Sequence, residues 1–177
     1  MNIILIGFMG VGKSEVGRRL SERLGYHFLD TDALIEETEE KKISEIFDEK
    51  GEKYFRDLET EVIKTLEDYD EFVISTGGGI VLREENVKIL KELGPLILLS
   101  SAPHVIYQRL KDETDRPLLK ETEEVPSSRS KEVKLDKINE LLSKRNPIYD
   151  KIADHKIDTS ERTPSEVVEE IFEWLGI

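Results

Sequence analysis

The chain has 177 residues, a length typical of one domain with a substantial core, and we expect residues 1–177 to form a single domain. Its 39 Asp and Glu outnumber its 26 Lys and Arg, and the resulting net charge of −13 argues against nucleic-acid binding through a broad basic surface. The absence of cysteine excludes disulfides, thiolate catalysis and cysteine-ligated metals.

Apolar stretches are short throughout the chain. None approaches the roughly 20 residues that a membrane span requires. The first of them, 3–6, is too short for a signal peptide and has no basic residue before it. We therefore expect a cytoplasmic protein that binds neither membrane nor nucleic acid, and nothing in the composition demands more than a monomer.

Strand-like apolar runs alternate with helical patterns, which is typical of an α/β fold with a parallel sheet and helices on both faces. Strands are expected at 3–6, 27–29, 72–75, 96–99 and 155–157. Helices are expected at 13–24, 32–38, 43–67, 84–93, 103–111, 133–151 and 164–175. The runs at 3–6, 72–75 and 96–99 are apolar almost throughout, so both faces of these strands should be buried.

The stretch 112–131 has the weakest pattern in the chain, with hardly any apolar residues over 120–131. A loop of this length is uncommon inside a compact domain and is usually functional where it occurs. We therefore predict a mobile lid at about 112–131.

Residues 7–14 read GFMGVGKS and lie between an apolar run and a helical pattern. A strand followed by a glycine-rich loop and a helix is what a phosphate-binding P-loop requires. The glycines allow backbone N–H groups to point at one anionic centre, and the helix adds its positive end. Lys13 can then reach the β- and γ-phosphates, and Ser14 can bind Mg²⁺. The predicted nucleotide-binding residues of this segment are Gly10, Val11, Gly12, Lys13, Ser14 and Glu15.

The other strand ends carry the second group of candidate residues, because ligands of an open parallel sheet bind beyond the carboxyl ends of its strands. Asp30 and Asp32 follow the second strand, and a helix cap explains one acid but not two. The three glycines of 77–79 follow the third strand and permit close backbone approach to a ligand. The fourth strand leads into the helix that carries Arg109.

Arg56 and Glu59 lie three residues apart in a predicted helix. On spacing alone, such a pair is interpreted as a solvated ion pair that contributes about 0.2–0.5 kcal/mol to the stability of the helix.

Six motifs in this order resemble the shikimate kinase family: GFMGVGKS (7–14), LDTD (29–32), YFRDLE (54–59), STGGG (75–79), DRPLL (115–119) and RNPIY (145–149). The resemblance runs over nearly the whole chain. It implies a P-loop kinase fold like that of the nucleoside monophosphate kinases, with a five-stranded parallel sheet. It also implies transfer of the γ-phosphoryl group of ATP to the 3-hydroxyl of shikimate, in the pathway to chorismate and the aromatic amino acids.

The resemblance implies roles for residues that match the family's motifs. Asp32 would align the reacting hydroxyl and take its proton, and Asp30 would help hold Mg²⁺ through water beside Ser14. Arg56 and Arg145 would grip the shikimate carboxylate. The shikimate-binding region would be about 30–60, and the substrate-binding residues would be Asp32, Arg56, Glu59, Gly77, Gly78, Gly79 and Arg145.

The nucleotide side of the site is implied in the same way. Arg109 and Pro164 would flank the adenine, and Arg116 would close onto the phosphates from the lid. Lys13, Asp32 and Arg116 would be the catalytic residues, and Mg²⁺ the cofactor. Charge stabilisation and positioning by such groups are what phosphoryl transfer needs, and a forked guanidinium suits a carboxylate better than an ammonium does.

Two features depart from the usual patterns. The third strand ends in Ser75, where many P-loop enzymes have an Asp for the metal, and this shifts the predicted metal binding toward Asp30. The segment between Arg116 and Arg145 is about ten residues longer than expected for the family, with the excess near 125–132. Because loop-closure entropy grows slowly with length, the insertion should cost under about 1 kcal/mol.

Alternatives within the same fold are a gluconate-type or other small-polyol kinase and a nucleoside monophosphate kinase. The first would not require the aspartate, glycine and RPLL motifs together, and no base-recognition pocket for the second is found in the sequence. A nucleotide-binding regulatory domain is the alternative from another class. It would need no counterpart of Asp32, Arg56 and Arg145.

Overall fold

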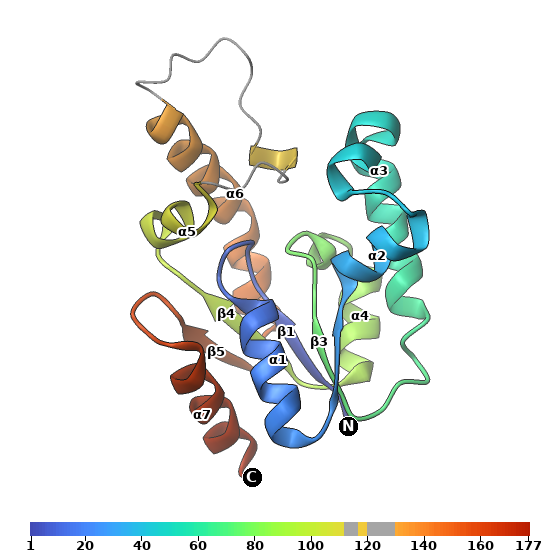
Figure 1. Ribbon diagram of the computed structural model, residues 1–177, viewed down its shortest axis with the longest axis vertical. Coiled ribbons are helices and arrows are strands. Elements are labelled where there is room, and N and C mark those ends of the chain that lie inside the picture. Colours follow the sequence, from blue (N-terminus) through green and yellow to red (C-terminus); the bar gives the residue numbers. More distant parts are fainter. Residues whose placement is uncertain (112–116, 120–129) are drawn as a thin grey trace.

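The computed structural model describes residues 1–111, 117–119 and 130–177. Its centre is a five-stranded parallel sheet in the order β2-β3-β1-β4-β5, with helices on both faces (Figure 1). The strands are β1 (Ile3–Ile6), β2 (His27–Asp30), β3 (Phe72–Ser75), β4 (Leu96–Ser100) and β5 (His155–Asp158). The predicted α/β fold is thus confirmed.

One or two helices follow each strand in the sequence. They are α1 (Lys13–Leu24), α2 (Thr31–Glu39), α3 (Ile43–Lys64), α4 (Glu84–Leu93), α5 (Pro103–Leu110), α6 (Ser130–Ile152) and α7 (Pro164–Leu175), with short 3₁₀ turns η1 (Ile80–Leu82) and η2 (Pro117–Leu119). Within the described ranges, no helix is both long and apolar enough to cross a membrane.

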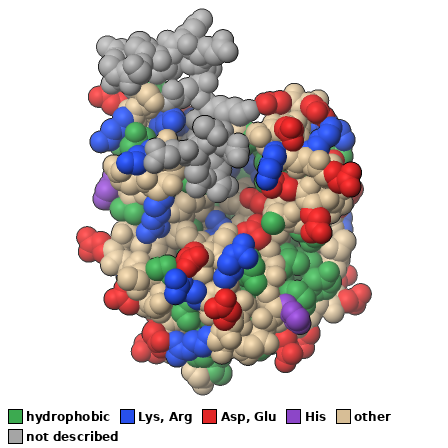
Figure 2. All heavy atoms as spheres, in the orientation of Figure 1, with side chains coloured by type: hydrophobic (Ala, Val, Ile, Leu, Met, Phe, Trp, Pro, Cys, Tyr) green, Lys and Arg blue, Asp and Glu red, His purple; other side chains and the backbone are tan. Residues whose placement is uncertain are grey.

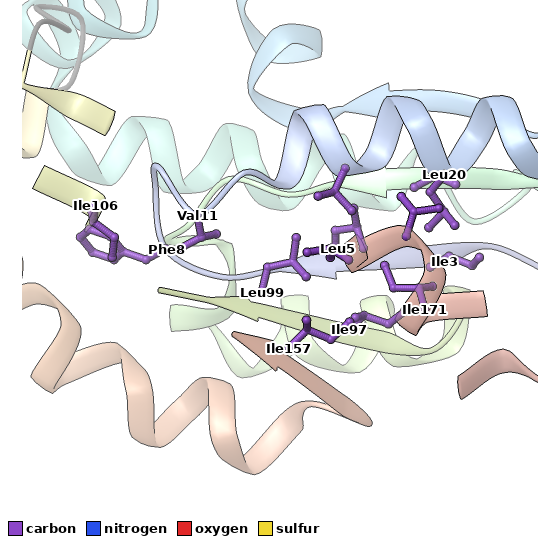
Figure 3. Close-up of a cluster of buried hydrophobic side chains, with 14 of the residues drawn as sticks. Ile3, Leu5, Phe8, Val11, Leu20, Ile97, Leu99, Ile106, Ile157 and Ile171 are labelled. Carbon is purple, nitrogen blue, oxygen red and sulfur yellow. The ribbon is translucent and has the colours of Figure 1, made fainter. Parts of the chain in front are cut away.

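The central strand β1 is apolar at every position, and each of its residues is fully buried. Alternate side chains point to opposite faces of a strand, so β1 contributes to two separate cores. Ile3 and Leu5 pack toward α1 and α7, in the cluster that Figure 3 shows, and Ile4 and Ile6 pack toward α3, α4 and α6. The neighbouring β3 and β4 are also buried on both faces, as predicted, whereas β2 and β5 form the edges of the sheet.

Helices α2 and α3 form an arm beside the carboxyl ends of the strands (Figure 1). The arm has a small core of its own, made by Ile35, Ile46, Phe55, Leu58 and Val62. This core fixes α3 against α2, and it thereby determines where the polar side chains of α3 face the sheet.

The helix expected at 43–67 is present as α3, but it ends at Lys64 and has a break inside it. Gly51 interrupts α3 with φ 80° and ψ 172°, a backbone conformation available essentially only to glycine. The helical pattern continues on both sides of this break, which is why periodicity alone did not reveal it. The other helices and strands agree with the predicted ranges to within one to three residues at each end. Most of the predicted lid at 112–131 lies outside the described residues.

We expect Gly51→Ala to lower the free energy of unfolding by about 1–3 kcal/mol, because the side chain is strained at this φ and ψ. An added Cβ would meet no atom within 4 Å, so the cost comes from the backbone alone. Chemical denaturation measures it, with Lys53→Ala on the exposed face of the same helix as a control that stays within about 0.5 kcal/mol of wild type. Equal stability of the two variants would contradict the assignment.

Candidate active site

The P-loop connects β1 to α1 and is shaped by close packing around its glycines. Gly10 and Gly12 have φ values of 76° and 98°, and a Cβ added at Gly10 would lie 2.9 Å from the side chain of Leu110. The Lys13 ammonium donates hydrogen bonds of 2.8 Å to the carbonyl oxygens of Gly7 and Phe8. The lysine therefore lies over the loop at the N-terminal end of α1, where the helix dipole favours an anion.

Ser14 and Asp30 form an oxygen-rich cluster next to the P-loop. The Ser14 hydroxyl donates to Asp30 Oδ2 at 2.7 Å, and Ser75 Oγ lies 3.4 Å from Ser14 Oγ. Asp30 Oδ1 meanwhile accepts the backbone N–H groups of Asp32 and Ala33 and so caps α2. The cap explains one carboxylate oxygen, and the other is directed at Ser14.

This donor set fits Mg²⁺, which prefers oxygen ligands and keeps several waters when it also binds substrate phosphates. Among the described residues there is no group of three or more His, Cys, Asp and Glu side chains that could form a complete metal cage. A hydroxyl and one carboxylate beside a phosphate-binding loop are consistent with a metal held partly by the nucleotide.

A cavity of about 620 Å³ opens over the P-loop, and Figure 2 shows the surface hollowed between the arm and the side that carries α5 and α6. Eight of the predicted site residues line it together: Gly10, Gly12, Lys13, Ser14, Glu15, Asp30, Asp32 and Gly78. The side chain of Val11 is instead buried in the core and leaves only its backbone to the loop. Arg18, Glu36 and Lys42 also line the cavity and were not predicted.

A smaller cavity of about 70 Å³ adjoins the first one and shares Met9, Asp32, Ile43 and Gly78 with it. All the predicted acceptor-binding residues line this cavity: Asp32, Arg56, Glu59, Gly77, Gly78, Gly79 and Arg145. Its apolar wall was not predicted and consists of Met9, Ile43, Phe47, Phe55, Pro117 and Leu118. The structure thus brings together residues from the arm, from α6 and from the loop of residues 77–79, which we call the glycine loop.

Arg56 and Glu59 form a buried ion pair. Arg56 Nη1 donates to Glu59 Oε2 at 2.7 Å, and the two residues are 7% and 0% exposed. Arg56 Nη2 also donates to Glu52 at 3.0 Å. The solvated pair expected from spacing alone is therefore wrong, because this face of α3 packs against the glycine loop and not against solvent.

Charged side chains pack directly against the backbone of the glycine loop, residues 77–79, so a larger residue at any of these positions would require them to shift. A Cβ at Gly77 would lie 2.5 Å from Asp32 Oδ1, and a Cβ at Gly79 would lie 2.2 Å from Arg56 Nη1. A Cβ at Gly78 would lie 3.3 Å from Arg145 Nη1. The loop therefore brings backbone and charged groups of the small cavity into contact with one another.

The carboxyl of Glu59 is partly desolvated by this packing. Burial raises its pKa to about 7, the guanidinium of Arg56 opposes this shift, and the neighbouring Asp32 adds to it. Among the described residues, Glu59 Oε1 accepts no hydrogen bond. The carboxyl thus retains a proton to a higher pH than a solvated glutamate does.

The guanidinium of Arg109 contacts the backbone of the P-loop. It donates to the carbonyl oxygens of Gly10 and Thr159, and the Thr159 hydroxyl donates to the carbonyl oxygen of Val11 at 2.9 Å. Thr159 was missed in the sequence, although its position directly after a strand was a usable signal. Pro164 begins α7 and is not among the described residues that line either cavity, and Arg116 lies outside the described residues.

The sheet order, the P-loop and the adjoining pocket define a P-loop kinase. A family model described as shikimate kinase matches residues 9–176. A shikimate kinase from Thermodesulfovibrio yellowstonii is 48% identical over 170 residues, which cover 96% of this chain and 92% of the relative. The chain therefore belongs to the shikimate kinase family.

Solved structures agree with this assignment. The shikimate kinase from Acinetobacter baumannii, in complex with shikimate, matches with a TM-score of 0.88 and 34% identity, over 98% of this chain and 92% of that one. The shikimate kinase from Aquifex aeolicus matches with a TM-score of 0.81 and 41% identity, over 99% and 96% of the two chains.

The raised pKa of Glu59 predicts a pH dependence of stability. The native carboxyl keeps its proton up to about pH 7, whereas the unfolded one releases it near 4.5, so this group stabilises the fold less as pH rises through that window. The unfolding free energy of wild type minus that of Glu59→Gln should therefore decrease from pH 4.5 to pH 7, measured by urea denaturation. A difference that is constant with pH would contradict the shift. Glu61→Gln, exposed on the same helix, controls for the loss of one carboxylate.

Proposed function

We propose that the chain transfers the γ-phosphoryl group of ATP to the 3-hydroxyl of shikimate and so gives shikimate 3-phosphate and ADP, in the pathway to chorismate. The observation that carries this proposal is the small cavity, in which buried Arg56 and Arg145 lie beside the P-loop cavity. Two buried guanidinium groups suit a small substrate with one carboxylate.

On the nucleotide side, backbone N–H groups of 10–14 bind the phosphates, and Lys13 neutralises charge on the transferring group. Ser14 would hold Mg²⁺ directly and Asp30 would do so through water. The bound metal would supply positive charge next to the phosphates. The contacts of Arg109 with the P-loop backbone support its place beside the adenine, where Pro164 is the second proposed neighbour. Arg116 is proposed to add a cation from the lid.

On the acceptor side, Arg56 and Arg145 bind the shikimate carboxylate and Glu59 holds Arg56 in position. Backbone groups of 77–79 contact the ring of the substrate. Asp32 lines both cavities, so it is the carboxylate that can align the acceptor hydroxyl with the γ-phosphate. An alkoxide is unfavourable at neutral pH, and Asp32 therefore takes the proton late in the transfer.

The family match favours neither a gluconate-type kinase nor a nucleotide-binding regulatory domain. The remaining proposals are a cytoplasmic location, a monomeric state and no role in binding nucleic acid, and the net charge of −13 supports the last of these. The residues from 1 to 177 are proposed to act as one kinase domain.

Coupled detection of ADP release tests the function directly. The purified chain is assayed with ATP and Mg²⁺ and with shikimate, gluconate, AMP or no acceptor. We expect turnover with shikimate and only background with the other three. Turnover with gluconate or AMP alone, or equal turnover without an acceptor, would contradict the proposal.

Arg56→Lys should raise the shikimate KM by about tenfold or more, since a charge-assisted hydrogen bond contributes roughly 1.5–3 kcal/mol and an ammonium cannot form the forked contact. The ATP KM should stay near the wild-type value. Steady-state kinetics with each substrate varied in turn measure both constants. Arg23→Lys is the matched control, because this arginine pairs with Glu169 on the surface. A higher ATP KM with an unchanged shikimate KM would show that Arg56 is misassigned.

A further inference from the structure

The RNPIY motif ends in Tyr149, to which the proposed reaction assigns no role. Tyr149 lies in α6 one helical turn after Arg145, and it is 1% exposed. Its ring packs in the core between α6 and the sheet, and its hydroxyl donates a hydrogen bond to the carbonyl oxygen of Gly78. One helix thus brings a guanidinium and a phenol to the same residue of the glycine loop, because Arg145 Nη1 lies close to Gly78.

Among the described residues, side-chain hydrogen bonds hold the glycine loop and the η1 turn after it at three points. Thr31 Oγ1 accepts the N–H of Gly77 at 2.9 Å, and Asn86 Nδ2 donates to the carbonyl oxygen of Ile80 at 2.8 Å. The third point is the bond from Tyr149 to Gly78. Of the three, it alone comes from the helix that carries a proposed carboxylate-binding arginine.

The buried phenol is a permanent donor. Burial raises the pKa of Tyr149 to about 12, although the nearby Arg145 opposes the shift, so the hydroxyl keeps its proton at any assay pH near neutrality. Buried tyrosine hydroxyl groups normally need a partner, and here that partner belongs to the backbone of the proposed acceptor site.

We propose that Tyr149 is a positioning residue for the acceptor substrate: its hydroxyl fixes Gly78 relative to Arg145, so that the loop and the guanidinium contact one carboxylated ligand together. Tyr149 does not line the small cavity and so acts through the other two residues. The proposal rests on the assignment of this cavity to shikimate. A general role in folding would affect the binding of ATP and shikimate alike, whereas this role affects the binding of shikimate alone.

Tyr149→Phe tests the proposal, since it keeps the ring and removes only the hydroxyl. We expect the shikimate KM to rise roughly three- to tenfold, as for the loss of one neutral hydrogen bond, while kcat and the ATP KM stay within about twofold of wild type. Calorimetric titration with shikimate in the presence of ADP should show the same loss of affinity, and titration with ADP alone should show none.

Tyr69→Phe is the matched control, because that ring lies at the surface next to β3 and is 37% exposed. Its kinetic constants should equal those of wild type. Thermal unfolding of each variant sets an assay temperature at which all the proteins are folded.

Three outcomes would overturn the proposal: an unchanged shikimate KM, equal rises in both KM values, or a rise in the ATP KM alone. The last would assign Tyr149 to the P-loop, whose Gly7 carbonyl also lies beside Gly78. Wild-type protein that does not phosphorylate shikimate would instead refute the proposed function, so the two failures are distinguishable.

Discussion

The structure of the site depends on the burial of charged side chains beneath the glycine loop, residues 77–79. Arg56, Glu59 and Arg145 are at most 7% exposed, and removing such groups from water costs several kcal/mol each unless partners compensate. The pairing of Arg56 with Glu59 recovers part of this cost. On the proposed assignment, the desolvation cost that is not recovered would favour a ligand whose carboxylate pairs with the guanidinium groups of Arg56 and Arg145. Because these groups are already ordered in the fold, a small acid would meet a preorganised site.

Packing of the two cores explains how a short sheet can hold this cluster. β1 is buried on both faces and places the P-loop at the centre of the carboxyl edge of the sheet. Asp30 ends β2 and the glycine loop follows β3, so both lie at the same edge. The arm of α2 and α3 has its own apolar core, and this core carries Arg56 toward the loop. Charged residues thus occupy a buried position because apolar residues on the neighbouring positions of α3 hold the helix there.

The parts of the molecule that depend on local pattern could be predicted from the sequence. The alternation of apolar runs with helical periodicity was sufficient for the sheet and its helices, and the P-loop and glycine motifs indicated the strand ends that form the cavities. The break at Gly51 was not predicted, since an isolated glycine does not disturb the period of a helix. The burial of Arg56 and Glu59 was not predictable from their spacing, because an i, i+3 pair has the same spacing on the buried and on the exposed face of a helix. Thr159 was missed for a related reason: its hydrogen bond to Val11 joins residues 148 positions apart.

The contact between the two cavities has a consequence for phosphoryl transfer. Efficient transfer requires that the acceptor oxygen and the phosphorus lie about 3–3.5 Å apart and in line, and an error of about 1 Å can cost a hundredfold in rate. Here a Cβ added at Gly78 would lie 3.3 Å from the carbonyl oxygen of Gly7 and 3.4 Å from the backbone nitrogen of Met9, so the glycine loop runs close to the backbone of the P-loop. Backbone atoms have no rotamers, so a Cβ at Gly78 would be accommodated by a shift of the neighbouring backbone or of Arg145. On the proposed assignment of the two cavities, main-chain packing would keep donor and acceptor close, and Asp32, which lines both cavities, would orient the hydroxyl between them.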